Sequence, residues 1–137
     1  MIRILVFPLF LLGLGGCLFN DPCPNMKFER FMESDRIVVS DNLNRPMRTI
    51  EDQSVIAEIT KFAISHNAEW ETPWGGTPVA PVRANFYVGE KFIGDLGVGD
   101  NFLTAQGCGF FQSRDVSLKD RSILLSLLDV ADLYDGK

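Results

Sequence analysis

The sequence predicts an α+β domain: an antiparallel meander sheet of four or so strands with two helices packed on one face. Three observations support this class. Apolar and polar residues alternate in runs between residues 82 and 105, and glycine-containing turns separate the runs. Residues 49–67 and 117–136 instead space their apolar residues at helical intervals. The expected element order is β-α-β-β-β-α, and a chain of 137 residues suits one domain.

The first strand is expected at residues 37–39, a β-branched Ile-Val-Val run. Residues 26–32 before it are compatible with either a strand or a turn of helix. Residues 42–46 have the composition of a turn. A helix follows, with Thr49 or Ser54 as its N-cap. Its apolar stripe consists of Val55, Ile56, Ile59, Phe62 and Ala63.

Residues 66–81 are the most irregular part of the domain, because prolines and glycines interrupt regular structure there. Both tryptophans, Trp70 and Trp74, lie in this segment beside Glu69 and Glu71. Rigid aromatic side chains in such a loop are typical of recognition surfaces, and the carboxylates would suit a cationic partner. The alternative is that the rings fold back over the sheet as a small core. The sequence leaves both interpretations open.

The second half of the chain predicts a three-stranded or four-stranded meander and a closing helix. The buried face of its first strand is expected to consist of Val82, Ala84, Phe86 and Val88. Residues 91–98 return with Phe92, Leu96 and Val98 on one parity, residues 102–105 give a third strand, and residues 110–111 can extend the sheet. The last helix begins after Ser117, with Asp120 as its capping-box partner. Its buried stripe is expected to be Ile123, Leu124, Leu127 and Leu128.

The amino-terminal segment has the pattern of an export signal. Arg3 precedes an apolar run over residues 4–14, which is too short to cross a hydrocarbon core of about 30 Å. Residues 14–17, Leu-Gly-Gly-Cys, resemble the lipobox of bacterial lipoproteins, a family that is cleaved just before the cysteine. This resemblance covers residues 1–17 alone.

The resemblance implies a processed and lipidated chain. Residues 1–16 are then a lipoprotein signal peptide, residues 17–27 a lipidated tether and residues 28–137 a single globular domain. Cys17 is expected to carry a thioether-linked diacylglycerol and an amide-linked acyl chain such as palmitate, which together hold a protein stably on a membrane. Leu18 takes the place of the aspartate that retains enterobacterial members at the inner membrane, so the resemblance implies the outer membrane in a Gram-negative source.

Lipidation of one of the three cysteines leaves Cys23 and Cys108. An exported domain meets an oxidising compartment, so this even remainder predicts a Cys23–Cys108 disulfide. Closing a loop of that length contributes roughly 4 kcal/mol in the chain-entropy model. A free catalytic thiol at Cys108 is the alternative. Two cysteines and one histidine fall short of the four ligands of a structural zinc, so no metal is expected.

The charge balance excludes some classes of partner. The net charge is −5, and removal of residues 1–16 takes away only one basic residue, so no nucleic-acid binding is expected. The acyl chains, rather than the peptide, are expected to hold the membrane. His66, the only histidine, is expected near the end of the first helix, where a cation interacts favourably with the helix dipole. No nucleophile motif accompanies it.

These observations predict a non-enzymatic lipoprotein of the bacterial cell envelope that faces the periplasm and needs no cofactor. We expect it to bind another envelope macromolecule, as an accessory subunit or as an inhibitor or immunity-type protein. A small-ligand carrier with a groove between sheet and helices is the first alternative. An enzyme that acts on the cell wall is a less favoured one.

Overall fold

The computed structural model describes residues 26–73, 75–76, 78–107 and 110–134. Several predicted features lie outside the described residues and stay predictions: the signal peptide at 1–16, Cys17, Cys23, Trp74 and Cys108. Helices and strands in chain order are η1 (Glu29–Glu33), β1 (Arg36–Asp41), β2 (Pro46–Ile50), α1 (Gln53–Ser65), β3 (Val82–Val88), β4 (Lys91–Val98), β5 (Phe102–Gly107), β6 (Phe110–Asp115), α2 (Leu118–Leu127) and α3 (Ala131–Tyr134).

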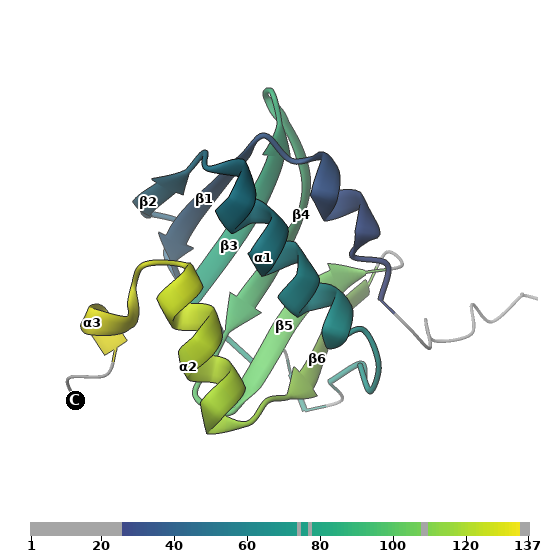
Figure 1. Ribbon diagram of the computed structural model, residues 1–137. Helices are drawn as coiled ribbons and strands as arrows, with labels where there is room; N and C mark the ends of the chain where they lie inside the picture. Colours follow the sequence, from purple (N-terminus) through teal and green to yellow (C-terminus); the bar gives the residue numbers. More distant parts are fainter. Residues whose placement is uncertain (1–25, 74, 77, 108–109, 135–137) are drawn as a thin grey trace, which may run out of the picture.

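The strands form one sheet in the order β2-β1-β3-β4-β5-β6, and every neighbouring pair is antiparallel. Figure 1 shows α1 and α2 lying across the same face of this sheet. The predicted α+β class with an antiparallel sheet is therefore confirmed. The described sheet has six strands, where the sequence predicted four or so.

Strand β2 accounts for part of this difference. Its residues are largely exposed, and it begins at Pro46, which lacks the N–H that an inner strand would need. An exposed edge strand shows no apolar alternation, so the sequence predicted a turn and a helix cap there. Thr49 pairs with Val38 and does not cap the helix. Asp52 is the N-cap of α1, and its carboxylate accepts a hydrogen bond from the Ser54 backbone N–H at 2.8 Å.

A register shift between β3 and β4 overturns a second expectation. Phe86 lies opposite Gly94, but its neighbour Tyr87 lies opposite Phe92, so one extra residue is inserted in β4. Such a bulge reverses the side-chain parity of the residues beyond it. Leu96 is fully buried as predicted, whereas Phe92 is exposed and its ring contacts Tyr87 edge-on at 5.8 Å. Val88, at the end of β3, is exposed as well.

The first predicted helical stripe is confirmed, with Val55 only partly buried. Helix α2 begins as predicted, with Ser117 Oγ accepting a hydrogen bond from the Asp120 N–H. Its buried residues differ from the prediction, because Ile123 is exposed and Leu125 is buried. Leu124 and Leu128 are buried as predicted and Leu127 packs against the core partly buried, so the observed stripe differs from the predicted one by Leu125 in place of Ile123.

The segment before β1 is a turn of 3-10 helix, which decides between the two possibilities for residues 26–32. Met26, Phe28 and Phe31 are all buried, and the Phe31 ring stacks on Phe86 with centroids 3.9 Å apart. The Met26 N–H donates to the carbonyl of Asn67 at 2.8 Å. Residue 26 is therefore already part of the folded domain, although the sequence assigned it to the tether.

The chain before β3 crosses the sheet on the face opposite the helices. Leu96 and Val98 point to the core, so Gly97 between them faces the other way. A Cβ atom at Gly97 would collide with the Thr104 hydroxyl and come within 2.7 Å of the Ala80 methyl. Ala80 is fully buried. The absence of a side chain at position 97 lets the incoming segment lie directly on the sheet.

Candidate functional site

The residues that follow α1 are fixed first through His66, the C-cap of this helix. Its ring stacks on Phe62 with centroids 4.2 Å apart, and its Nδ1 lies 2.8 Å from the Phe62 carbonyl oxygen. Its Nε2 lies 3.3 Å from Asp120 Oδ2 at the start of α2. The hydrogen bond from His66 lowers the pKa of the Asp120 carboxyl below its ordinary value, and Ser117 adds to this effect. The ring thus links the end of one helix to the beginning of the next.

Ser65, His66 and Asp120 have the residue types of a catalytic triad, and Ser65 Oγ lies 3.0 Å from His66 Nδ1. The geometry does not support a nucleophile, however. A carbonyl only accepts, so the short contact to the Phe62 oxygen places a proton on Nδ1. The Ser65 hydroxyl donates to that same carbonyl at 2.7 Å. An Nδ1 that carries a proton cannot take one from Ser65, and the arrangement favours a structural role for His66.

Trp70 points inward. Its side chain is 6% exposed and its ring meets Phe28 edge-on at 5.6 Å. The indole N–H donates to the His66 carbonyl at 2.7 Å. Of the two possibilities that the sequence left open for this ring, packing against the core is the one observed. Trp70 thereby anchors the loop to the core. Trp74 is outside the described residues.

Glu69 and Glu71, on either side of Trp70, point outward and are exposed. Glu69 has a left-handed backbone with φ 66°, which is uncommon for a residue with a side chain. Glu71 forms an isolated antiparallel bridge with Ser113 on β6, with both N–H···O bonds at 2.9 Å. The inward tryptophan and this bridge together hold the backbone of residues 69–71, from which the two carboxylates extend into solvent.

Arg114 on β6 fixes the same loop from the sheet. Its guanidinium donates to the carbonyls of His66 and Ala68 at 3.2 and 2.8 Å, and it reaches Glu69 Oε2 at 3.5 Å. Only 14% of the Arg114 side chain is exposed, against 82% for Glu69. The cation is thus largely turned toward the backbone, and the carboxylate of Glu69 is left in solvent.

These side chains surround a hollow of about 430 Å³ beside the β6 edge of the sheet. We call it the acidic hollow, and its lining residues are Glu69, Glu71, Phe102, Ser113, Arg114 and Asp115. The hollow is lined by the carboxylates of Glu69, Glu71 and Asp115 and by the largely buried guanidinium of Arg114. The charge that it presents to solvent is therefore negative. An aromatic ring beside these carboxylates suits a lysine or arginine side chain with its apolar stem and cationic end.

No family model, no curated protein and no solved structure matches this chain. Within the described ranges no cluster of three or more His, Cys, Asp or Glu side chains has the arrangement of a metal site. The helices of the described part are all too short or too polar to span a bilayer.

The sequence indicated part of this site and missed the rest. Glu69 and Glu71 were singled out, and the structure places both on the acidic hollow. Phe102, Ser113, Arg114 and Asp115 were not, because they reach the hollow only through the pairing of β5 with β6. The double phenylalanine at residues 110–111 was the only signal for β6, and it does not reveal that Arg114 lies beside residues 66–69.

Proposed function

We propose that this protein is a lipid-anchored protein of the bacterial cell envelope, attached to the outer membrane and facing the periplasm. In this proposal it is not an enzyme and binds another envelope macromolecule. The lipobox pattern at residues 14–17 supports the anchor. The acidic hollow supports the binding role and points to a cationic segment of a partner protein. The partner is either an assembly to which this chain is an accessory subunit or an enzyme that it inhibits.

The observation that carries the proposal is the fixed backbone from which Glu69 and Glu71 project into solvent. Trp70, Arg114 and the bridge to Ser113 hold the backbone between them, so binding requires little ordering of the loop. A surface that is ordered before binding loses less conformational entropy on association, and this raises affinity. Because the exposed charged groups that line the acidic hollow are all negative, long-range attraction would also accelerate encounter with a basic partner.

A charge-neutralised variant tests the hollow. Glu69→Gln, Glu71→Gln and Asp115→Asn would be combined in the lipidated chain. Cross-linking in intact cells would precede capture from detergent-solubilised envelope. We expect the partner recovered with the wild-type protein to be lost or to bind about tenfold more weakly, since each exposed pair contributes up to about 1 kcal/mol. Raising the salt concentration should reproduce the loss for the wild type.

A matched control carries the same change in charge elsewhere. Glu51→Gln, Glu58→Gln and Asp132→Asn alter exposed residues that do not line the hollow. This control should retain the partner. Equal recovery with both triple variants would remove the acidic hollow from the proposal, and the anchor is tested separately by Cys17→Ser. That variant should leave the protein unprocessed or release it from the outer membrane.

A further inference from the structure

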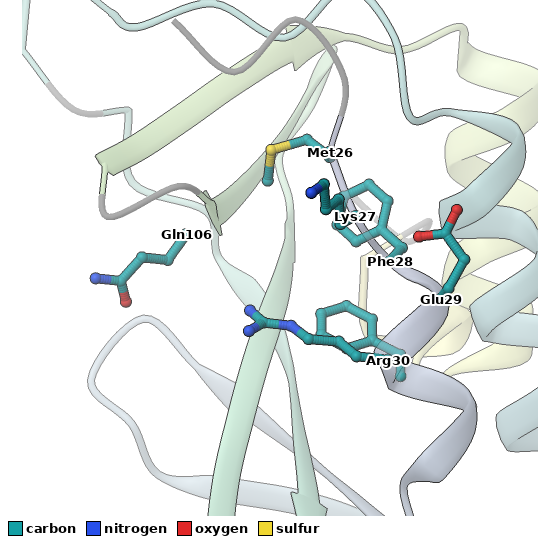
Figure 2. A pocket seen from close by; sticks show the side chains of 7 residues that line it. Met26, Lys27, Phe28, Glu29, Arg30 and Gln106 are labelled. Atoms are coloured by element: carbon teal, nitrogen blue, oxygen red, sulfur yellow. The ribbon is translucent and has the colours of Figure 1, made fainter. Parts of the chain in front are cut away.

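A second hollow, of about 470 Å³, lies where the described chain begins. Residues 26–31 line it together with Gln106 from β5, as Figure 2 shows. Its volume is within the range of small-molecule sites, about 300–1,000 Å³. Met26, Phe28 and Phe31 belong to the core and form its apolar floor. We call it the amino-terminal hollow.

The charged side chains of this hollow are not distributed evenly. In Figure 2, Lys27 and Arg30 point to the same side as Met26, whereas Glu29 points the opposite way. The Arg30 guanidinium lies 5.9 Å from the centre of the Phe31 ring. Among the described residues, neither Lys27 nor Arg30 forms an ion pair. A pair of exposed cations beside an apolar floor is thus present in a chain whose net charge is −5.

The amino-terminal hollow lies close in the sequence to Cys17, the residue that is expected to carry the lipid anchor. Residues 18–25 join Cys17 to Met26, and an extended chain advances at most about 3.5 Å per residue. If Cys17 carries the lipid, the hollow is held within roughly 30 Å of the membrane that holds the anchor. At such a distance a bilayer surface is permanently available to a site that has basic side chains and apolar contacts.

We propose that the amino-terminal hollow binds an anionic phospholipid of the membrane to which the chain is anchored. Lys27 and Arg30 contact the headgroup phosphate, and the start of an acyl chain lies over the small part of the apolar floor that reaches the surface of the hollow. This inference rests on the lipid anchor of the proposed function. The net charge of the chain argues against attraction to such a surface, but the local charge of this hollow is the opposite of the net charge. Each basic residue near an anionic surface raises affinity about fivefold.

The test uses the full lipidated chain in vesicles of phosphatidylethanolamine with or without 30% phosphatidylglycerol. The phosphatidylglycerol carries a photoactivatable group at the top of an acyl chain, and mass spectrometry locates the cross-linked peptides. We expect cross-links to concentrate in residues 26–31, and the double variant Lys27→Gln/Arg30→Gln to lower their yield at least tenfold. The control Lys61→Gln/Lys119→Gln, which changes exposed lysines on α1 and α2, should leave the yield unchanged.

Several results would overturn the inference. Cross-links that are scattered, that fall on residues 69–71, or that do not respond to Lys27→Gln/Arg30→Gln would each do so while leaving the anchor intact. Cross-links that survive undiminished when the probe is a phosphatidylethanolamine would remove the requirement for an anionic lipid. A chain whose Cys17 bears no diacylglycerol and which stays outside the vesicles would remove both the proposed anchor and this inference. As a control for folding, both double variants should have the melting temperature of the wild-type protein.

Discussion

Replacement of Trp70 by alanine should destabilise the domain severely. The side chain is 6% exposed, and a buried tryptophan removes about 150–250 Å² from water. At about 25 cal/mol per Å² this burial stabilises the fold by roughly 4–6 kcal/mol, close to the 3–5 kcal/mol that large-to-alanine core substitutions cost. Native domains are stable by only about 5–15 kcal/mol. The variant should therefore be marginally folded.

Trp70→Phe separates packing from hydrogen bonding. It keeps a ring against Phe28 and removes the indole N–H that donates to the His66 carbonyl. That carbonyl keeps a second donor, the Arg114 guanidinium at 3.2 Å, so no buried acceptor is left unpaired. The loss should then be about 1–2 kcal/mol, from a smaller ring and one net hydrogen bond.

Urea unfolding followed by far-ultraviolet circular dichroism measures both variants against the wild type. The urea midpoint should fall in the order wild type, Trp70→Phe, Trp70→Ala. On heating, the melting temperature of the alanine variant should lie at least about 10 °C below that of the wild type. An alanine variant within about 0.5 kcal/mol of the wild type would refute the inward placement of Trp70. Because this variant loses stability, loss of a partner in Trp70→Ala would not identify Trp70 as a contact residue.

Three further predictions concern stability and covalent structure. Gly97→Ala should cost about 1–3 kcal/mol in urea unfolding, because its methyl group would collide with the Thr104 hydroxyl and with the Ala80 methyl, and an unchanged midpoint would contradict that close approach. The Asp120 pKa is lowered from 3.8, so its pair with His66 stabilises the fold above that pH and the contribution disappears as the pH falls through the lowered pKa. Asp120→Asn should therefore differ in stability from the wild type at pH 6, the difference should shrink as the pH falls through the lowered pKa of Asp120, and a constant difference would argue against the pair. Non-reducing mass spectrometry should find Cys23 joined to Cys108 in the exported protein, and two free thiols would exclude the bridge.

The parts of the fold that the sequence predicted well are those where one side of an element is buried. The alternation along β3 and the stripe of α1 both arise from burial of one face, so Val82, Ala84 and Phe86 could be assigned correctly. Edge strand β2 has no such face, and it was missed. Phe92 was assigned to the core because a bulge leaves no mark on the apolar pattern.

The candidate site was predictable only where it is local in sequence. Glu69 and Glu71 stand out beside a tryptophan in an irregular segment. The direction of Trp70 was left open, since a ring in a proline-rich loop can turn either way and the decision lies with Phe28, far along the chain. Arg114 reaches the loop through strand pairing, and no spacing rule reveals a contact across 45 residues.

The entry of the chain at Met26 has a mechanical consequence. In the proposed lipid-anchored protein, a load on the anchor would reach the domain at Met26, which is hydrogen-bonded to Asn67 and belongs to the same core cluster as Phe28 and Phe31. Tension on this end of the chain would act on the Met26–Asn67 hydrogen bond and on these rings, because they lie nearest to the point where the chain enters the domain. It would also pull, through Phe28 and Trp70, on the loop that carries Glu69 and Glu71. If the protein is anchored and binds a partner as proposed, force on the tether and force on the partner would act on the same pair of aromatic rings.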